Sequence, residues 1–346
     1  MKKPTMNDVA KLAGVSQTTV SFVLNNAPIA ISDEVRQRIY AAVETLGYQH
    51  RTRSKKAPKS GEKLIILLIP NASNAFYLEL IKHVSFFVSQ KGYKLFVINT
   101  NRNAADEEGY LKFLSSVGHQ IAGIIYGFTP SVTDFSFLDV RNIPITVIGE
   151  MVENPSISSV TLDSIKSGEM VANYLIGLGH KDIVYITSPP RTVSLSRERR
   201  LTGIQCAVEG KGTLTVLSGK NENEFESENY EVEIGYQFTL EYYKKQKPSA
   251  TAFIGANDMI AFGIIKALKE LNIKVPHQVS VCGFDNILFS DLTNPSLTTV
   301  DHCLYWRCSM AVDIIVNKKK FEVPPVINYD PVLIVRASSG PAPKSS

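Results

Sequence analysis

Apolar and polar positions change their spacing near residue 63, and this change divides the chain into two parts. Before it, apolar residues recur at helical spacing and predict three short helices within residues 6–47. After it, continuous apolar runs alternate with longer amphipathic stretches, which is typical of parallel strands joined by helices and covered on both faces. The pattern therefore predicts a small all-α part followed by an α/β part.

In the first part, two short helices are joined by a tight turn. Thr5 and Ser16 are placed to cap them, and Gly14 lies at the turn, where glycine adopts positive φ at little cost. We predict that the apolar stripe of the two helices is formed by Val9, Ala10, Leu12, Val20, Val23 and Leu24. The outer side of the second helix carries Gln17, Thr18, Thr19 and Ser21. Short polar side chains at this position favour contacts with bases and phosphates, although an ordinary αα-hairpin has the same pattern.

The distribution of charge favours DNA binding. Residues 1–63 contain 11 Lys/Arg and 5 Asp/Glu, a net charge of +6, whereas the remainder contains 26 and 28, a net charge of −2. The basic character therefore belongs to the first part, and a polyanion is its expected partner. The alternative, a solubilising tail, fits poorly with capped helices that have an apolar stripe.

The α/β part consists of two repeating units, each predicted to be a doubly wound parallel sheet. Strands of the first unit are expected at residues 63–70, 94–100, 121–126 and 143–148, and those of the second at 182–187, 214–217, 250–254 and 279–283. A helix at 306–316 is expected to return to the first unit. Two such lobes leave a ligand cleft at the carboxyl ends of their strands.

These patterns predict the domain boundaries. Residues 1–48 are a helix-turn-helix headpiece, 49–62 a basic linker and 63–337 a two-lobed core. Lobe 1 is expected at about 63–161 plus 292–325, lobe 2 at about 162–291 plus 326–337, and a disordered tail at 338–346.

Composition excludes several classes of protein. The mean hydropathy of −0.01 and the lack of an 18-residue apolar run argue against a membrane span. The initial lysines are followed by no apolar core, so we expect no export signal and a cytoplasmic location. None of the cysteines forms a Cys-x-x-Cys pair, and Cys206 and Cys282 lie in apolar runs that predict core positions. We therefore expect no metal site and no cofactor.

The order of motifs along the chain resembles the lactose-repressor/galactose-repressor (LacI/GalR) family of bacterial transcription regulators. The head motif Asp-Val-Ala-x-x-Ala-Gly-Val-Ser-x-x-Thr-Val-Ser begins at Asp8 and ends at Ser21. Further matches lie at residues 69–77, 123–125, 178–183, 257–263, 283–286 and 294–300. The resemblance implies a homodimer that binds a near-palindromic DNA operator, and a core like a periplasmic sugar-binding protein. A small effector between the lobes would change the affinity for DNA.

The resemblance also implies the DNA contacts. Gln17, Thr18 and Phe22 would face the major groove, where Phe22 packs either on a thymine methyl or against the headpiece. Phosphate or helix-edge contacts would be made by Thr5, Ser16, Thr19 and Ser21. The linker departs from the family because it lacks the leucine that enters the minor groove. Its Arg51, Arg53 and Lys55 follow phosphates, enter a narrow minor groove or belong to a flexible linker.

The effector site implied by the resemblance contains Phe76, Tyr77, Arg200, Tyr230, Asn257 and Asp285. Aromatic faces suit the apolar side of a sugar ring, and the polar groups suit hydroxyls or a charge. Each residue also has an ordinary structural interpretation: Phe76 and Tyr230 as core residues, Asp285 as a turn residue. The arginine is ambiguous, because Arg197 and Arg199 lie close to Arg200.

Three functions fit all or part of these patterns. A repressor whose effector is a sugar, sugar phosphate or purine explains the whole chain, whereas a solute-binding protein for a sugar or nucleoside explains only the α/β part. An enzyme is not expected, because the nucleophile-elbow, dinucleotide-binding and phosphate-loop motifs are absent from the sequence. We therefore expect no catalytic residue.

Overall fold

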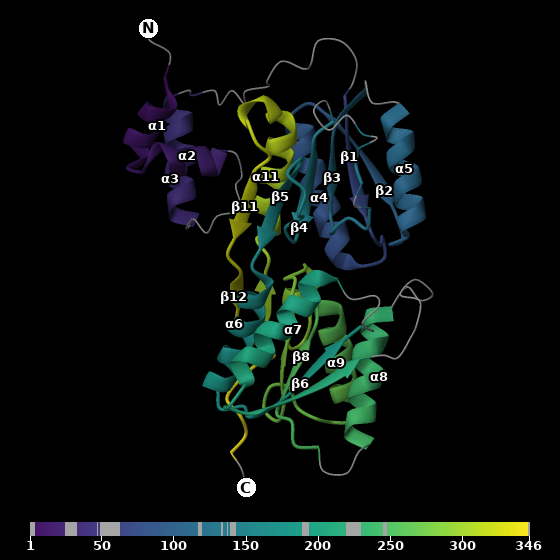
Figure 1. The fold of residues 1–346 in the computed structure, drawn as a ribbon. Coiled ribbons are helices and arrows are strands. Elements are labelled where there is room, and N and C mark those ends of the chain that lie inside the picture. Colours follow the sequence, from purple (N-terminus) through teal and green to yellow (C-terminus); the bar gives the residue numbers. More distant parts are fainter. Residues whose placement is uncertain are drawn as a thin grey trace. The chain divides into compact units, whose positions relative to one another are not determined.

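The structure is a computed structural model, and it describes residues 4–24, 33–46, 48, 63–116, 120–132, 134–136, 138, 143–188, 194–218, 230–244 and 248–344. Its contacts divide the chain into two units, Met1–Lys59 and Ser60–Ser346, which are considered separately (Figure 1). The mixed α/β fold predicted from the sequence is confirmed, with an all-α first unit and parallel sheets in the second. None of the described helices is long and apolar enough to cross a membrane.

The first unit contains α1 (Met6–Ala13), α2 (Gln17–Leu24) and α3 (Asp33–Leu46). Thr5 forms a capping box with Asp8 at the start of α1, and Gly14 ends this helix with a φ of 66°. That conformation is why glycine is needed at the turn. The small core consists of Val9, Ala10, Ala13, Val20, Val23, Ile39 and Ala42.

One predicted core position of this unit is wrong. Leu12 is 53 % exposed, and Ala13 is buried in its place. The short side chain at position 13 lies on the α1 face that packs against the other two helices, and Leu12 lies about 100° away around the helix. The spacing of apolar residues in this eight-residue helix did not show which of Leu12 and Ala13 is buried.

Lobe 1 of the second unit is a six-stranded parallel sheet in the order β11-β5-β4-β3-β1-β2. Its strands are β1 (Leu64–Ile69), β2 (Lys94–Asn99), β3 (Ile121–Tyr126), β4 (Ile145–Gly149), β5 (Ile157–Leu162) and β11 (Val326–Tyr329). Alternate β1 residues point to opposite faces, so Ile65 and Leu67 pack with α4 (Ala75–Gln90) and α11 (Leu304–Val316). Ile66 and Leu68 pack on the face covered by α5 (Ala104–Ser116).

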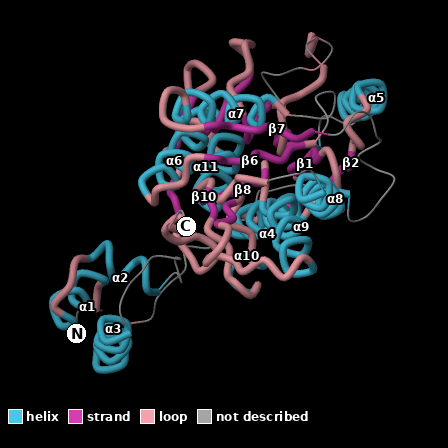
Figure 2. Tube along the Cα trace, turned by 90° about the horizontal axis from the view of Figure 1, so that it is seen from below, coloured by secondary structure: helices cyan, strands magenta, loops and turns pink. Residues whose placement is uncertain are grey.

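Lobe 2 is a four-stranded parallel sheet in the order β7-β6-β8-β9. Its strands are β6 (Asp182–Thr187), β7 (Thr213–Ser218), β8 (Ala252–Gly255) and β9 (Ser280–Cys282). Figure 2 shows the pair α6 (Ser164–Gly177) and α7 (Leu195–Val208) on one side of the sheet and the pair α8 (Tyr230–Lys244) and α9 (Asp258–Glu270) on the other. Glycines allow the close approach within each pair: a Cβ added at Gly203 would lie 2.0 Å from the carbonyl oxygen of Ile165.

Three chain segments cross between the lobes, and they correct the predicted lobe boundaries. One joins β5 to α6, one joins β10 (Thr299–Asp301) to α11, and one joins β11 to β12 (Val332–Ile334). β11 pairs with β5 and so belongs to lobe 1, not to lobe 2 as predicted. Leu297 and Val300 pack in the core of lobe 2, although they lie in a range assigned to lobe 1. These strands are so short that the sequence pattern does not show which sheet each of them joins.

The predicted disordered tail is also wrong for much of its length. Ser338 is fully buried; its Oγ donates to the carbonyl oxygen of Val281 at 2.6 Å and accepts from the amide of Thr298 at 2.8 Å. Further along, the amide of Ala342 donates to the carbonyl oxygen of Leu178 at 2.9 Å. Hydrogen bonds, rather than apolar contacts, order this Ser/Pro/Gly-rich segment, which is why composition misled the prediction.

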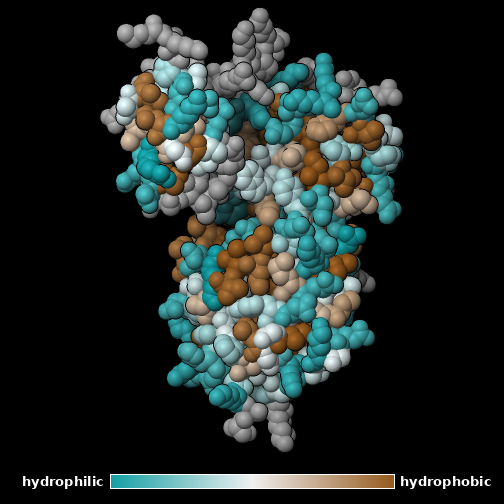
Figure 3. Space-filling view, turned by 90° about the vertical axis from the view of Figure 1, so that its left-hand side faces the viewer, coloured by the Kyte–Doolittle hydropathy of each residue, from teal (hydrophilic) through white to brown (hydrophobic). Residues whose placement is uncertain are grey.

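Figure 3 shows one face of the protein, where hydrophilic residues are interspersed with apolar patches. Large apolar side chains that are exposed in lobe 2 include Leu288, and Phe289 and Leu292 of the short helix α10 (Phe289–Leu292). Leu78 and Phe86 of α4 are exposed in lobe 1. Cys206, predicted as a core residue, is exposed, whereas Cys282 is buried.

Candidate functional site

The start of α2 is the candidate DNA-contacting surface of the first unit. Ser16 caps the helix, since its Oγ accepts from the amide of Thr19 at 3.0 Å and lies 2.8 Å from the Thr19 hydroxyl. Gln17, the next residue, is exposed, as is Thr5, whose hydroxyl donates to Asp8 Oδ2 at 2.6 Å. An exposed amide at the first turn of the second helix is placed as base-reading side chains are in helix-turn-helix proteins.

Several predicted DNA contacts lie outside the described residues. Arg51, Arg53 and Lys55 are among them, as are the side chains of Thr18 and Phe22. Ser21 is half-buried on α2. The polar outer side of the helix is therefore defined here by Ser16, Gln17 and Thr19.

The second unit contains a cavity of about 300 Å³ where the strands of both lobes end. Five of the six predicted effector residues line it: Phe76, Tyr77, Arg200, Asn257 and Asp285. Phe76 and Tyr77 lie in the first turn of α4, after β1, whereas Asn257 and Asp285 follow β8 and β9. Parallel strands bring these residues to one edge of each sheet, so positions more than 200 residues apart in sequence meet.

Tyr230, the sixth predicted residue, is not among the residues that line this cavity. It is the first residue of α8 and packs against the core of lobe 2. The next residue, Glu231, points toward the cleft instead and forms a buried ion pair with Arg197. Adjacent helical positions face about 100° apart, so a shift of one residue separates a core side chain from a cleft side chain.

The structure distinguishes the three arginines that the sequence left ambiguous. Arg197 and Arg200 both line the cavity, whereas Arg199 donates from Nη1 to Glu150 Oε2 at 2.5 Å. Arg200 is held by the carbonyl oxygen of Ala256 at 2.8 Å and lies 4.9 Å from the ring centre of Phe284.

Asp285 lies beside Arg200, with Oδ1 3.8 Å from Nη2 of the guanidinium. Burial nevertheless raises the pKa of Asp285 well above its ordinary value, and the Arg200 charge opposes this shift only in part. Burial likewise lowers the pKa of His302 well below 6.5, and the nearby positive charge of Arg200 lowers it further. At neutral pH His302 is therefore uncharged.

The aromatic wall of the cavity is formed by rings in edge-to-face contact. The ring centres of Phe76 and Tyr77 are 5.3 Å apart, and those of Phe76 and His302 are 6.2 Å apart. Asn257 adds a polar group to the lining: its Oδ1 accepts from the amide of Ile260 at 2.9 Å and so caps α9. Its amide nitrogen is then left for another partner.

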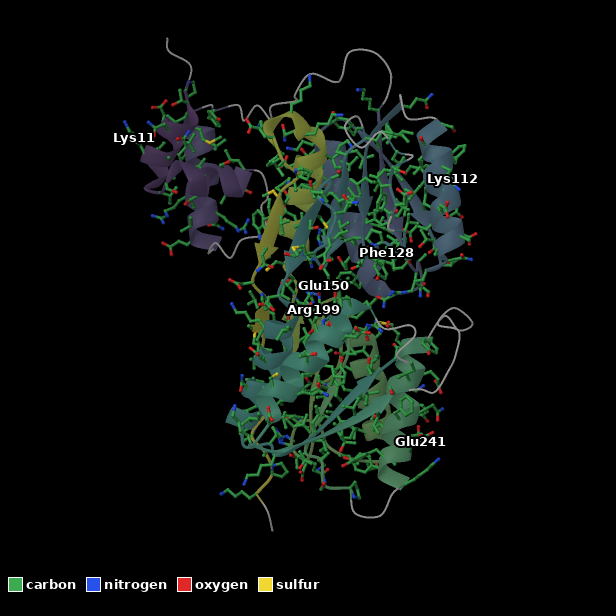
Figure 4. All side chains as sticks on the ribbon, viewed as in Figure 1. Lys11, Lys112, Phe128, Glu150, Arg199 and Glu241 are labelled. Atoms are coloured by element: carbon green, nitrogen blue, oxygen red, sulfur yellow. The ribbon has the colours of Figure 1, made fainter. Side chains whose placement is uncertain are left out.

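Two polar bridges across the cleft were missed by sequence reasoning. In the first, Asn74 Nδ2 of lobe 1 donates to Glu231 Oε2 of lobe 2 at 2.5 Å, and Glu231 also pairs with Arg197. In the second, Glu150 at the end of β4 accepts from Arg199 of α7, and Figure 4 shows these two side chains between the lobes. Glu150 also accepts from the Ser164 hydroxyl at 2.7 Å.

Two of the cleft residues that were not predicted lie at positions that the sequence pattern could have indicated. Asn74 and Glu150 each follow a buried strand within a few residues, the position at which α/β ligands bind. No sequence pattern indicated Arg307 and His302. They lie in the segment that returns to lobe 1, and short-range patterns do not reveal where that segment packs. Among the described residues, no three His, Cys, Asp or Glu side chains are grouped closely enough to hold a metal ion.

The chain is similar to known families in both units. Residues 5–50 match the family described as bacterial regulatory proteins, lacI family, and residues 172–339 match the periplasmic binding protein-like domain. The HTH-type transcriptional repressor PurR of Proteus mirabilis is 31% identical over 350 residues, which cover 98% of each chain. The NTD biosynthesis operon regulator NtdR of Bacillus subtilis is 31% identical over 299 residues, or 86% of this chain and 87% of that protein.

A solved structure has the same fold. The LacI family transcriptional regulator from Enterococcus faecium with bound ribose has a TM-score of 0.68 at 22% identity and covers 81% of this chain and 99% of its own. The family expected from the head motif is therefore confirmed by relatives that match nearly the whole length. This chain belongs to the lacI family of bacterial regulatory proteins and is a transcriptional regulator with a helix-turn-helix region and a periplasmic-binding-protein-like domain.

Proposed function

We propose that this protein is a repressor that binds a near-palindromic DNA operator as a homodimer, and that a small sugar-derived effector in the cleft changes its affinity for the operator. The observation that carries the proposal is the presence in one chain of a helix-turn-helix surface with Gln17 exposed and of a polar–aromatic cavity at the strand ends. A solute-binding protein requires only the second of these features.

A sugar derivative suits the chemistry of the cavity. The rings of Phe76 and Tyr77 offer apolar faces and edges, and Arg200, Asn257 and Asp285 offer hydrogen bonds in the same cavity. The related regulator of Enterococcus faecium was solved with ribose. We propose that these five residues contact the effector here, with Arg197 and His302 beside them.

The two polar bridges supply a means of coupling. Asn74–Glu231 and Glu150–Arg199 join the lobes directly at the cavity, so a ligand that enters it competes with or reinforces these contacts. A ligand shifts a conformational equilibrium only through different contacts in the two states. We therefore propose that the bridges make the angle between the lobes depend on the ligand.

A homodimer is supported by the apolar side chains exposed on α4 and α10. Leu78 of α4 and Leu292 of α10 are among the most exposed large apolar residues, and such surfaces mark protein–protein contacts in many proteins. Sedimentation velocity of the full chain and of Leu292→Asp tests this proposal. A monomer at micromolar concentration in the wild type would contradict it.

The test of DNA binding is selection of sites from a random duplex library by the full chain. We expect enrichment of a sequence with two related half-sites, and loss of specific binding in Gln17→Ala. Gln37→Ala is the matched control, because Gln37 is an exposed glutamine that belongs to α3 and not to α2. If the wild type enriches no sequence while sugars still raise its melting temperature, the solute-binding alternative is favoured.

A further inference from the structure

The cavity proposed as the effector site has an unusual balance of charge. Among the described residues that line it are four arginines, Arg102, Arg197, Arg200 and Arg307, and two carboxylates, Glu150 and Asp285. Two ion pairs are internally neutral: Arg197 pairs with Glu231, and Arg199 pairs with Glu150. Apart from these two pairs, Arg200, Arg307 and the carboxyl of Asp285 lie at the cavity.

Arg307 is the clearest case of a buried arginine without an ion pair among the described residues. Its side chain, on α11, is almost fully buried, with 4 % of the residue exposed. Nη2 donates to the carbonyl oxygens of Val160 at 3.1 Å and Gly149 at 3.4 Å, but Nε has no partner, and Arg307 forms no ion pair with a described carboxylate. The charge of Glu150 favours the charged guanidinium only in part. Burial lowers the pKa of Arg307 to about 10, so the guanidinium stays charged at neutral pH.

Arg200 is in a similar position. It is 7 % exposed, its Nε has no partner in the described structure, and its nearest carboxylate is Asp285 at 3.8 Å. Since burial raises the pKa of Asp285, that carboxyl offers less negative charge than its distance suggests. A buried charge without a counter-charge is costly, and a bound anion removes that cost.

Two neutral side chains beside these arginines also have buried nitrogens without a partner, and the amide of Asn257 is a donor. Asn257 Nδ2 and His302 Nε2 have no partner in the described part of the chain, and these residues are 1 % and 2 % exposed. Nδ1 of His302 lies 3.5 Å from Arg200 Nη2 and also 3.5 Å from Asp285 Oδ1, so these contacts fix no single tautomer of the ring. In the cavity lining, the unpaired buried nitrogens of Arg200, Arg307 and Asn257 are all donors.

We propose that the ligand of this cleft is an anionic sugar derivative, a monosaccharide that carries a carboxylate or a phosphate, with the anionic group held between Arg200 and Arg307. The inference rests on the proposed effector site and narrows its ligand. Carboxylate and phosphate oxygens accept several hydrogen bonds and supply negative charge, whereas a neutral sugar hydroxyl supplies no charge. The cavity volume of about 300 Å³ suits a single sugar ring and lies at the lower end of ligand sites.

The experiment titrates the full chain with matched neutral and anionic probes, followed by calorimetry and thermal shift. The probes are D-glucose, D-gluconate and D-glucose 6-phosphate, and D-ribose with D-ribose 5-phosphate. We expect at least one anionic probe to bind about tenfold or more tightly than its neutral counterpart, as one or two charge-assisted hydrogen bonds imply. The gluconate and phosphate arms distinguish the two anionic groups.

Variants test whether the preference for anionic probes depends on Arg307. Arg307→Met keeps most of the side-chain volume, and we expect it to bring the anionic-to-neutral affinity ratio close to one. Without ligand, it should melt at the same temperature as the wild type or higher, because it removes a buried charge that has no ion pair among the described residues. The matched control, Arg336→Met, should melt lower, since Arg336 is paired with Asp291 at 3.3 Å and donates to the carbonyl oxygen of Leu297.

Three outcomes overturn the inference: neutral probes that bind as tightly as anionic ones, no stabilisation by any anionic probe at millimolar concentration, or an unchanged preference in Arg307→Met. Binding to the selected DNA is measured in parallel. A neutral sugar that changes DNA affinity would retain the proposed function and reject the anionic ligand. Tight binding of an anionic probe without any effect on DNA affinity would support the anionic ligand and contradict the proposed function.

Discussion

The headpiece and the cleft hold their functional residues in opposite ways. The candidate DNA contacts described by the structure lie within residues 5–21, and they are positioned by local features: two caps, one glycine turn and a helix. The candidate ligand contacts run from Asn74 to Arg307, and they meet only because two parallel sheets bring their carboxyl edges together. A local site is readable as a motif, whereas a dispersed site requires the fold.

The two regions also differ in what stabilises them. The described core of the headpiece has seven buried apolar residues, four of them valine or isoleucine and three alanine. Lobe 2 alone has a far larger core around β6 and β8. Small units bury a low fraction of their surface and are marginally stable. The headpiece should therefore be the more sensitive region to a single core substitution.

Val9→Asp in the headpiece core should have the largest effect. Val9 is fully buried, and an unpaired carboxylate there costs more than so small a unit can sustain. We expect loss of specific DNA binding in gel shift by about a hundredfold or more, since several kcal/mol correspond to that factor. Ligand-induced thermal shift of the second unit should be unchanged. If ligand binding were lost as well, the two regions would not be independent.

The next largest effect is expected from the cleft, in Glu231→Gln. This substitution leaves Arg197 buried without its carboxylate, a change that typically costs about 3–5 kcal/mol. Urea unfolding of the second unit measures this loss of stability.

Glu233→Gln is the control for this substitution. It lies on the same helix but is exposed, and its side chain only accepts from Gln237 at 2.5 Å. Equal destabilisation by the two variants would show that the buried pair contributes nothing specific to the cleft.

Much of the fold was predictable from the sequence because its strands are continuous apolar runs. β1, β3 and β6 were predicted to within a residue or so at each end. β5 was missed, although all six of its residues are buried, because it contains two serines and a threonine. Those polar groups are satisfied inside the sheet: Thr161 Oγ1 donates to Asn328 Oδ1 at 2.9 Å, and Ser159 Oγ accepts from the amide of Val152. A buried strand whose hydroxyl groups are hydrogen-bonded can have the same composition as an exposed loop, so composition did not identify β5.

The candidate cleft residues came from the resemblance to the LacI/GalR family, and their places in the fold explain only some of them. Phe76, Tyr77, Asn257 and Asp285 follow a strand or begin a helix, whereas Arg200 lies within α7, and the structure brings these five together. Glu231 and Arg197 do not stand out, since charged residues at the first turn of a helix are usual on a protein surface. Their burial arises from the facing lobe, which no local pattern contains. The roles of all these residues in ligand binding remain predictions.

A change of pH is expected to have a smaller effect on the free energy of unfolding, through the buried carboxyl of Asp258. Burial raises the pKa of Asp258 to about 6, despite hydrogen bonds from Ser290 and Thr299 that favour its ionised form. The folded protein thus holds this proton more tightly than the unfolded chain does. The resulting stabilisation is complete below the ordinary pKa of 3.8 and is lost as pH rises through about 6.

The expected difference between pH 4 and pH 7 is on the order of 2 kcal/mol, from the size of such a shift. Unfolding free energies of the wild type and Asp258→Asn across this range measure it. The variant has no titrating group at this position, so its stability should fall less steeply with pH. Parallel pH profiles would rule out a raised pKa at Asp258.

The smallest effect concerns the local geometry of the headpiece. Thr5→Ala removes the capping box, in which the Thr5 amide donates to Asp8 Oδ2 at 2.8 Å and the Thr5 side chain accepts from the Asp8 amide. Loss of such a cap costs about 1 kcal/mol, so α1 amides should exchange with solvent about fivefold faster. Thr5→Ser keeps the hydroxyl and should restore protection. Since the cap acts within one helix, amides of β6 in lobe 2 should be unaffected; faster exchange there would mean that the headpiece and the core open together, and that the local-versus-dispersed distinction does not extend to their stability.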